Sequence, residues 1–390
     1  GLAAVGGGTA AALAATSRGG HAPSPPRLLW RATLPVGNDI LMPQVFARAV
    51  VVFAATTKSS AYDAATGRSL WSAPMHDVAT DHTLIYAPSA EDGDIAATDP
   101  YSHARRWSFP QPPGFTAQAL AGPANGLLAL IDEHGTVIGL DARTGRRRWT
   151  HDAPATTLLR GVQGGVLIAW SGRETDAEKR LFALDAGTGA VRWNRPYPKS
   201  GMTFPGAGDL VFGSPTGDTV EALSVTTGRT AWTADVGDLG RLTVANGTVH
   251  VGGAVLHALD LATGRQKWAY RPTVPGDQDR TSLVSGGHAY VLDNRNLIAL
   301  DAGTGRRLWP AGTPAGDTAP LVAAGGLVCT GVAGTTGPGL YGWNAVTGEL
   351  VWNHPMASSN LTDPWALTTA GSVLAASQDS ILAAFHLARA

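Results

Sequence analysis

Cysteine is almost absent from this chain of 390 residues, and its single thiol, Cys329, cannot form an intrachain disulfide. Cys329 lies in the apolar run LVCTG, which predicts a buried strand and a free thiol in the core. A c-type haem needs the motif C-x-x-C-H, which the sequence lacks. Charged residues make up only 15% and the net charge is −1. Composition therefore gives no electrostatic case for binding nucleic acid or an anionic membrane surface.

The motifs of common catalytic and metal sites are missing too. Gly206-Ala207-Gly208 lacks the third glycine of a dinucleotide fingerprint, and the sequence has neither a Walker loop nor a G-x-S-x-G elbow. Acidic and imidazole groups gather in HDVATDH (residues 76–82), and Asp92-Gly93-Asp94 has the start of a calcium loop. A solvated loop and a hairpin turn account for these two segments better than an incomplete ligand set does. We therefore predict no catalytic residue and no metal ligand.

The chain does contain a short phrase repeated seven times. The copies read AYDAATGRSLW, IGLDARTGRRRW, FALDAGTGAVRW, EALSVTTGRTAW, HALDLATGRQKW, IALDAGTGRRLW and YGWNAVTGELVW. In each copy a tryptophan follows the glycine by four residues, and Asp, Ser or Asn precedes the glycine by four. Short polar side chains cap turns by accepting bonds from nearby amides, and glycine permits positive φ. The phrase predicts a buried strand, a tight turn and an outer strand that carries a docking tryptophan.

A worn copy and two partial copies complete the series. Asp99 precedes Trp107 by eight residues, as in the other copies, but His103 stands where glycine is expected. Upstream, Trp30 has no hairpin before it, whereas residues 364–386 hold three predicted strands and no final tryptophan. The outer strand at the start can complete the unit at the end, which lacks one, and this pairing would close a ring. The predicted docking residues are Trp30, Trp71, Trp107, Trp149, Trp193, Trp232, Trp268, Trp309 and Trp352.

Units of about forty residues with four short strands and Gly-rich turns predict an all-β propeller over residues 27–390. Each four-stranded antiparallel blade needs two neighbours to bury both faces, and ring closure removes the exposed ends of the stack. The strand near Trp30 is predicted to pair with the C-terminal strands. We expect eight blades, with the unit around Trp107 irregular, and keep nine as the alternative.

The A-x-D-x-x-T-G-x-x-x-W phrase resembles the PQQ-like repeat, with the tryptophan-docking motif of quinoprotein-type propellers. Members of that family include quinone-dependent dehydrogenases, outer-membrane assembly lipoproteins and extracytoplasmic domains of bacterial receptor Ser/Thr kinases. The dehydrogenases commonly carry a vicinal Cys-Cys pair, which this chain lacks, and long insertions that supply a Ca²⁺ site. Successive tryptophans here lie 36 residues (Trp71 to Trp107) to 44 residues (Trp149 to Trp193) apart, which leaves no room for such insertions. We expect neither PQQ nor Ca²⁺ as a cofactor.

The first residues are interpreted separately from the ring. The first sixteen carry no charge and are small and apolar, which is typical of the end of a signal peptide or a membrane anchor; a flexible linker is the alternative. Residues 17–26 then form a Gly/Pro-rich tether. We predict that residues 1–26 are disordered and that the protein is extracytoplasmic, secreted or membrane-anchored, in a bacterium.

Propeller geometry locates a possible binding site at the connections between blades. These connections contain a mixture of acidic, basic and aromatic side chains that suits a protein partner, a peptide or a small polar ligand: Asp39, Asp77, Phe115, Arg160, Thr203, Arg241, Arg280, Asp317, Asp363 and Trp365. The repeated Asp residues are assigned instead to turn capping.

We therefore expect a non-catalytic binding or scaffold module of the sensor type, and not an enzyme. The alternatives are a PQQ-dependent dehydrogenase and an assembly scaffold. The module is expected to be a monomer that binds no nucleic acid and meets the membrane only through its N-terminal segment.

Overall fold

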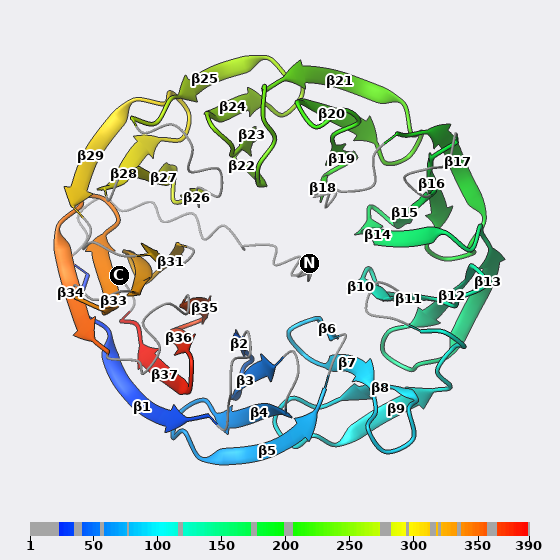
Figure 1. The fold of residues 1–390 in the computed structure, drawn as a ribbon, viewed down its shortest axis with the longest axis horizontal. Coiled ribbons are helices and arrows are strands. Elements are labelled where there is room, and N and C mark those ends of the chain that lie inside the picture. Colours follow the sequence, from blue (N-terminus) through cyan, green and yellow to red (C-terminus); the bar gives the residue numbers. More distant parts are fainter. Residues whose placement is uncertain are drawn as a thin grey trace.

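The computed structural model describes residues 23–34, 41–54, 58–75, 78–115, 120–172, 178–198, 206–273, 282–293, 296–312, 317–318, 321–333, 337–356 and 365–388. Within these ranges the strands form nine antiparallel sheets arranged radially around one axis (Figure 1). The predicted all-β propeller is confirmed, as is the pairing of the N-terminal strand with the C-terminal strands.

Each sheet is one blade. Its strands run in sequence order from the axis to the perimeter, except in the blade of β35, β36 and β37, whose outermost strand is β1. Blade 1 contains β2 (Leu41–Val45), β3 (Ala49–Ala54), β4 (Lys58–Asp63) and β5 (Ser69–Pro74). Blade 2 contains β6 (Ala79–Thr80), β7 (Ile85–Pro88), β8 (Ile95–Thr98) and β9 (Arg105–Phe109). Blade 3 contains β10 (Leu120–Ala124), β11 (Leu127–Ile131), β12 (Thr136–Asp141) and β13 (Arg147–Asp152), and blade 4 contains β14 (Thr157–Gln163), β15 (Val166–Ser171), β16 (Arg180–Asp185) and β17 (Val191–Pro196).

Blades 5 to 9 complete the ring. Blade 5 contains β18 (Gly206–Ala207), β19 (Leu210–Gly213), β20 (Thr219–Ser224) and β21 (Thr230–Asp235), and blade 6 contains β22 (Leu242–Ala245), β23 (Thr248–Val251), β24 (Leu256–Asp260) and β25 (Gln266–Tyr270). Blade 7 contains β26 (Ser282–Ser285), β27 (His288–Asp293), β28 (Asn296–Asp301) and β29 (Arg307–Gly312), and blade 8 contains β30 (Asp317–Thr318), β31 (Val322–Ala324), β32 (Leu327–Ala333), β33 (Gly339–Asn344) and β34 (Leu350–Pro355). Blade 9 contains β35 (Ala366–Ala370), β36 (Val373–Gln378), β37 (Ile381–His386) and β1 (Arg27–Thr33).

The described strands make nine blades, the alternative kept beside the expected eight. The unit around Trp107 is a complete four-stranded sheet, β6 to β9, although its turn lacks the usual glycine. The two chain ends form a further blade of their own, in which Arg27 of β1 pairs with His386 of β37. Figure 1 shows β1 beside β37, where the first and last strands of the chain meet.

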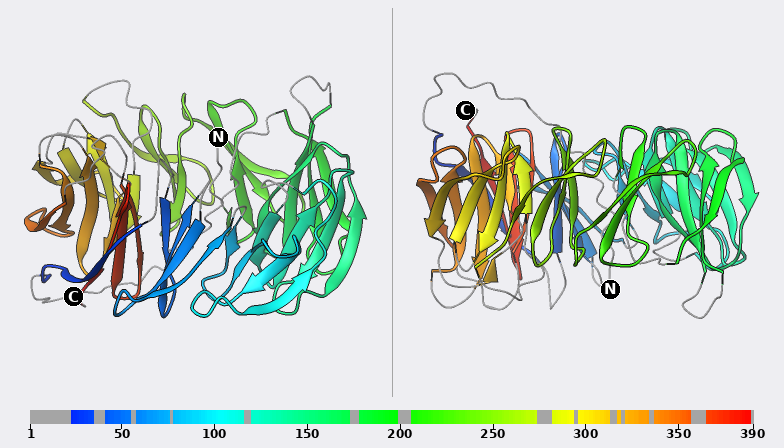
Figure 2. Two further views of the ribbon diagram at one scale, coloured as in Figure 1. Left: turned by 60° about the horizontal axis from the view of Figure 1, so that its bottom comes forward. Right: turned by 90° about the horizontal axis from the view of Figure 1, so that it is seen from above.

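The two flat edges of the disc are built from different connections (Figure 2). One edge, called here the turn rim, carries the turns between the first and second strands and between the third and fourth strands of each blade. The opposite edge, called the loop rim, carries the turns between the second and third strands and the connections from one blade to the next. The repeated Thr-Gly turns therefore all lie on the turn rim.

The outer-strand tryptophans lie at the junctions between blades. Trp149 of blade 3 is 8% exposed, and its Nε1 donates a hydrogen bond to the carbonyl oxygen of Ala186 in the turn of blade 4, at 3.0 Å. The same type of bond joins six further pairs: Trp30 to Ala64, Trp71 to Pro100, Trp107 to Ala142, Trp193 to Val225, Trp232 to Leu261 and Trp268 to Ala302. Each indole thus connects its own blade to the turn of the next.

Two tryptophans depart from this pattern. At the junction of blades 7 and 8 the carbonyl of Ala345 accepts its bond from the Tyr290 hydroxyl at 3.0 Å, and Nε1 of Trp309 is buried without a partner among the described residues. Trp352 faces blade 9, which has no turn between its third and fourth strands because the chain ends meet there. Its ring packs instead against the edge of Phe385, with centroids 4.9 Å apart.

The turn glycines are required for two reasons. Gly189 has φ of +73°, a conformation that costs an L-residue free energy. A Cβ atom at Gly189 would also lie 2.6 Å from Cε3 of Trp149, because the indole of the preceding blade packs directly on the turn. The worn turn solves the same problem differently, since His103 adopts φ of +57° and stacks on Trp71 with ring centroids 4.4 Å apart.

A β-bulge marks every outer strand just before its tryptophan. In blade 3 Gly139 pairs with Trp149 and Leu140 pairs with Arg147, so Arg148 is the extra residue. Register shifts at the corresponding place occur in all nine described blades. A bulge re-aims a side chain. Where the extra residue is basic, it pairs with the Asp of its own hairpin: Arg106 with Asp99, Arg148 with Asp141, Arg192 with Asp185 and Lys267 with Asp260.

Candidate functional site

The predicted binding residues lie on or near the loop rim, and the structure describes only part of the set. Asp39, Asp77, Thr203, Arg280 and Asp363 lie outside the described residues, as does the side chain of Asp317.

Three of the remaining members occupy separate blades and do not converge. Phe115, in the connection between blades 2 and 3, is half-buried and packs against the cores on both sides of blade 3. Arg160 is a half-buried bulge residue of the innermost strand β14, and burial lowers the pKa of its guanidinium. Arg241 is exposed beside β22, with its carbonyl accepting a bond from the Gly252 amide at 2.8 Å.

Trp365 lies in the core and not at the mouth of the ring. Its side chain is 2% exposed, and its Nε1 donates to the carbonyl of Val332 at 3.2 Å. A Cβ atom at Gly331 would lie 2.3 Å from the Trp365 ring, so the indole fills the space that this glycine leaves between blades 8 and 9. The Trp365 indole is therefore unavailable to a ligand at the rim.

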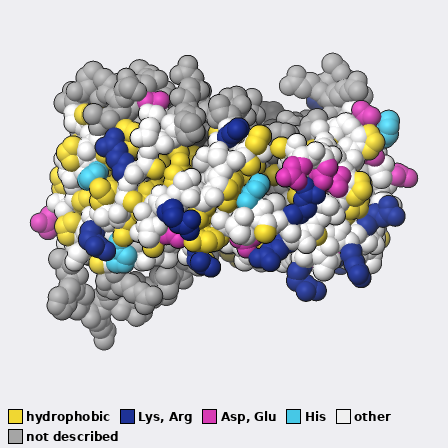
Figure 3. All heavy atoms as spheres, turned by 90° about the horizontal axis from the view of Figure 1, so that it is seen from below, with side chains coloured by type: hydrophobic (Ala, Val, Ile, Leu, Met, Phe, Trp, Pro, Cys, Tyr) yellow, Lys and Arg dark blue, Asp and Glu magenta, His cyan; other side chains and the backbone are white. Residues whose placement is uncertain are grey.

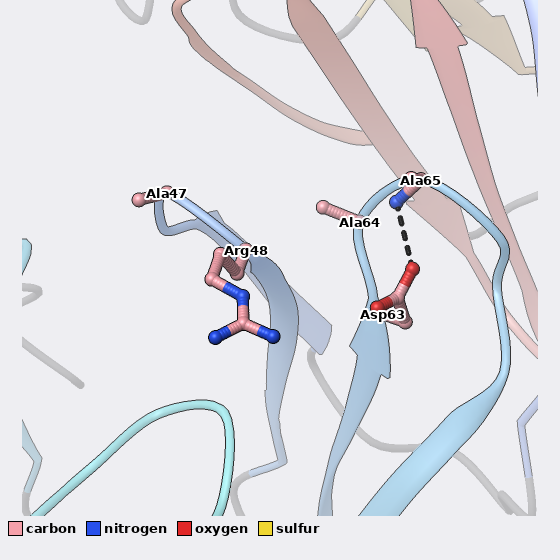
Figure 4. A pocket seen from close by; sticks show the side chains of 5 residues that line it. All are labelled: Ala47, Arg48, Asp63, Ala64 and Ala65. Carbon is pink, nitrogen blue, oxygen red and sulfur yellow. Dashed lines mark hydrogen bonds between the residues drawn. The ribbon is translucent and has the colours of Figure 1, made fainter.

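Sequence reasoning missed a polar cluster on the turn rim, at the junction of blades 1 and 2. Arg48 and Asp63 line a shallow pocket of about 180 Å³ together with Ala47, Ala64 and Ala65 (Figure 4). The guanidinium of Arg48 stacks over the Tyr101 ring, 4.1 Å from its centroid. The Tyr101 hydroxyl donates to Oδ2 of Asp63 at 3.1 Å, and hydrogen bonds from Thr66 are the main cause of the lowered Asp63 pKa.

This cluster exists because the worn turn differs from the other copies. Its sequence, Asp99-Pro100-Tyr101-Ser102-His103, places an aromatic ring where the other turns have small, aliphatic or basic residues. Arg68 of blade 1 also donates to the Tyr101 hydroxyl, at 3.3 Å. In the sequence, the divergence of this one copy from the other turns was the feature that could have indicated the cluster. Its hydrogen bonds connect blade 1 to blade 2, so a structural role in this junction is enough to explain the cluster.

The repeated turn acids are held by their own hairpins. Oδ1 of Asp141 accepts from the amides of Arg143 and Thr144 and from the Thr144 hydroxyl, while Oδ2 pairs with Arg148 at 2.5 Å. The Arg148 bond is the main reason that the pKa of Asp141 falls to about 2. Asp185 behaves likewise with Arg192, and its pKa also falls to about 2. These carboxylates cap turns, as their spacing predicts.

Two buried titratable side chains, Glu221 and His250, lie in the core of the ring. Glu221 is 4% exposed and accepts from Arg195 of the preceding blade at 3.0 Å and from the Thr230 hydroxyl at 2.5 Å. His250 is 1% exposed, has no hydrogen-bond partner in the described structure, and packs on Trp268 with centroids 5.6 Å apart. Burial lowers the pKa of His250 to about 4, with a smaller contribution from the charge of Lys267.

Cys329 is buried as expected, and burial raises the pKa of its thiol to about 12. A thiol reacts as its thiolate, so Cys329 is poorly suited to act as a nucleophile. Among the described residues, no three His, Cys, Asp or Glu side chains group as a metal site would require. The described part of the chain also has no helix with the length and apolarity needed to cross a bilayer.

Comparison with known proteins places this geometry in a family. A family model described as outer membrane protein assembly factor BamB matches residues 26–109, 111–218 and 216–389. The chain therefore belongs to this family of PQQ-like propellers.

Individual relatives differ in function and in how much of them is matched. Serine/threonine-protein kinase AfsK of Streptomyces coelicolor is 34% identical over 32% of this chain, which covers 14% of the kinase. Tetrathionate hydrolase of Acidithiobacillus ferrooxidans is 22% identical over 78% of this chain and 65% of that enzyme. Assembly factor BamB of Burkholderia pseudomallei is 27% identical over 81% of this chain and 87% of its own length.

Solved structures support the fold alone. The computationally designed Ika8 protein has a TM-score of 0.55 at 14% identity and covers 92% of this chain and 99% of its own. BamB from Moraxella catarrhalis has a TM-score of 0.52 at 18% identity, covering 79% of this chain and 95% of its own. The relatives include both enzymes and an assembly factor, so the family by itself does not assign an activity.

Proposed function

We propose that this protein is a non-catalytic binding module of the sensor or scaffold type that acts outside the cytoplasm, as a secreted or membrane-anchored propeller. The observation that carries the proposal is the use of the repeated acidic side chains. Asp63, Asp99, Asp141, Asp185, Asp260 and Asp301 each bond the amides of their own turn. The carboxylates that the repeat supplies in number are therefore committed to the fold, and not offered to a cofactor or a substrate.

The proposed partner is a protein, a peptide or a small polar ligand at the loop rim. Arg241 is exposed there, and the acidic turns around Asp92, Asp132 and Asp218 belong to the same edge. An assembly scaffold is a second candidate, favoured by the match to BamB of Burkholderia pseudomallei over 87% of that protein's length. Both functions require the protein to bind a partner without catalysing a reaction. We also propose that the ring acts as a monomer.

A quinone-loading experiment tests the non-catalytic proposal. Purified protein is mixed with PQQ and Ca²⁺, and thermal midpoint, quinone absorbance after desalting and dye reduction with ethanol are measured. We expect no retained quinone, no dye reduction and an unchanged midpoint, because ligand binding to the native state would raise the midpoint. Retained quinone with dye reduction would overturn the proposal in favour of a dehydrogenase.

Site-specific photo-crosslinking in the source bacterium tests the partner. A photoreactive amino acid at Arg241, on the loop rim, is expected to give a discrete crosslinked protein or peptide. The same amino acid at Val220, a buried residue of blade 5, is the matched control and is expected to give none. A partner captured equally from both positions would contradict a specific loop-rim site.

A further inference from the structure

Basic side chains gather on the turn rim of blades 3, 5, 6 and 7, at the start of the outer strands. They belong to the Thr-Gly turns themselves or to the two positions after the turn glycine. All are exposed: Arg143, Arg146, Arg147, Arg229, Arg265 and Arg307. We call this set the arginine arc. Because the repeat places its turns at equivalent positions in successive blades, the arc follows one edge of the disc.

The arc carries positive charge that the protein does not neutralise. The nearby turn acids already have basic neighbours outside the arc. Asp141 pairs with Arg148, Asp185 with Arg192 and Asp260 with Lys267, and Asp301 has the charge of Arg306 near it. None of the six guanidinium groups of the arc makes a hydrogen bond or an ion pair within the described parts of the chain.

Exposed apolar side chains lie on the same rim. Val191 and Leu350 begin their outer strands and are each 50% exposed, Val346 in the turn of blade 8 is 63% exposed, and Leu28 of β1 is 42% exposed. Of the large hydrophobic residues exposed in the described structure, only Met42 on the innermost strand β2 lies elsewhere. Arginines mixed with exposed aliphatic side chains are typical of a face that meets a membrane interface.

The opposite edge has the reverse charge. The loop rim carries Glu91, Asp92, Asp94, Asp132, Glu133, Asp218 and Asp238 in its turns and connections. Figure 3, which views the side of the disc that carries β1, β5 and β9, shows dark blue side chains along part of its lower edge and both colours elsewhere. A net charge of −1 thus conceals two faces of opposite sign, which the composition of the sequence could not reveal.

We propose that the turn rim docks on an anionic phospholipid surface. The arc lies along one flat edge of the disc, so several arginines can reach a planar array of phosphates together, and guanidinium groups bind phosphate oxygens in a bidentate manner. The chain also enters the ring at Arg27 on this rim. The acidic loop rim then faces away from the membrane, free for the partner proposed above, and the two proposals stand independently.

Vesicle co-sedimentation of the full chain tests this orientation. Phosphatidylcholine vesicles with and without phosphatidylglycerol are compared for the parent protein and for the variant Arg147→Gln/Arg265→Gln/Arg307→Gln. A basic residue near an anionic surface contributes roughly fivefold in binding, so the variant should bind phosphatidylglycerol vesicles about 100-fold more weakly. The matched variant Lys58→Gln/Arg241→Gln/Arg271→Gln removes equal charge from exposed loop-rim positions and should bind like the parent.

The apolar side chains give a second arm. Leu350→Ser should weaken binding about tenfold, because half of this side chain is available for burial in the interface. All these positions are exposed, so unchanged thermal midpoints are expected and would show that the variants fold. The proposal is overturned if the parent does not prefer phosphatidylglycerol, if the two triple variants lose binding equally, or if a soluble polyglutamate peptide displaces the protein from the vesicles, which would indicate an acidic protein partner.

Discussion

Substituting Gly189 by alanine tests whether the tryptophan of one blade occupies the space beside the turn glycine of the next. The new Cβ would lie 2.6 Å from Cε3 of Trp149, whose ring is 8% exposed and cannot move into solvent without losing its contacts. Gly189 also has φ of +73°. The substitution therefore combines a backbone cost with a steric one.

Gly165 separates the two costs. Its φ is +74°, nearly that of Gly189, but nothing lies within 4 Å of the position that its Cβ would take. Gly165→Ala should therefore cost about 1–2 kcal/mol of unfolding free energy, from the left-handed conformation alone. Gly189→Ala should cost a further 1–3 kcal/mol, roughly, because the indole and its neighbours must shift.

Urea unfolding followed by tryptophan fluorescence gives both values, and a double-mutant cycle completes the test. In a Trp149→Ala background, the cost of Gly189→Ala should fall to that of Gly165→Ala, because the clash is gone. Equal costs for the two glycine variants in the parent protein, or an unchanged cost for Gly189→Ala without the indole, would refute the reasoning.

Three further outcomes follow from buried groups. Below pH 6.5 the unfolded chain takes up a proton at His250, whereas the folded protein, with a pKa of about 4, does not; the parent should therefore lose about 3 kcal/mol of unfolding free energy between pH 6.5 and pH 4. His250→Phe should not show this loss in urea unfolding, and an equally steep loss in the variant would refute the reasoning. Arg195→Leu should cost about 3–5 kcal/mol in the same assay, because Glu221 stays buried without its charged partner, and adding Glu221→Leu should recover most of this cost; no recovery would contradict the pairing. Cys329 should react with a thiol reagent only after unfolding, and rapid labelling of native protein would argue against its burial.

The repeat phrase was enough to predict the architecture of each blade. Strand, turn and outer strand follow from local spacing, and the Asp and glycine positions specify the turn chemistry directly. The ring closure by β1 was also predictable, since Trp30 lacked a hairpin and the last unit lacked an outer strand. Nine blades was kept as the alternative to eight because the usual closure was preferred over the count of units; the structure has the full count, since His103 replaces glycine without loss of the sheet.

Contacts between blades could not be read from spacing. The position of Trp149 against Gly189 depends on the angle between two sheets, which no single copy encodes. The outer-strand bulge was missed for a related reason, because a bulge shows itself only in the register of two paired strands. The predicted binding set drew on connections of irregular length, where the sequence has no periodicity, and its described members do not converge.

The meeting of β1 with β37 has a consequence for how the molecule is made. A ribosome delivers Arg27 among the first residues of the ring, yet its hydrogen-bonding neighbour His386 is among the last. Until β37 has been synthesised, β1 lacks its neighbouring strand and the ring stays open. Because β1 and β37 are held together only by non-covalent contacts, a circular permutant that joins residues 27 and 388 through a linker and starts at another inter-blade connection should form the same closed ring.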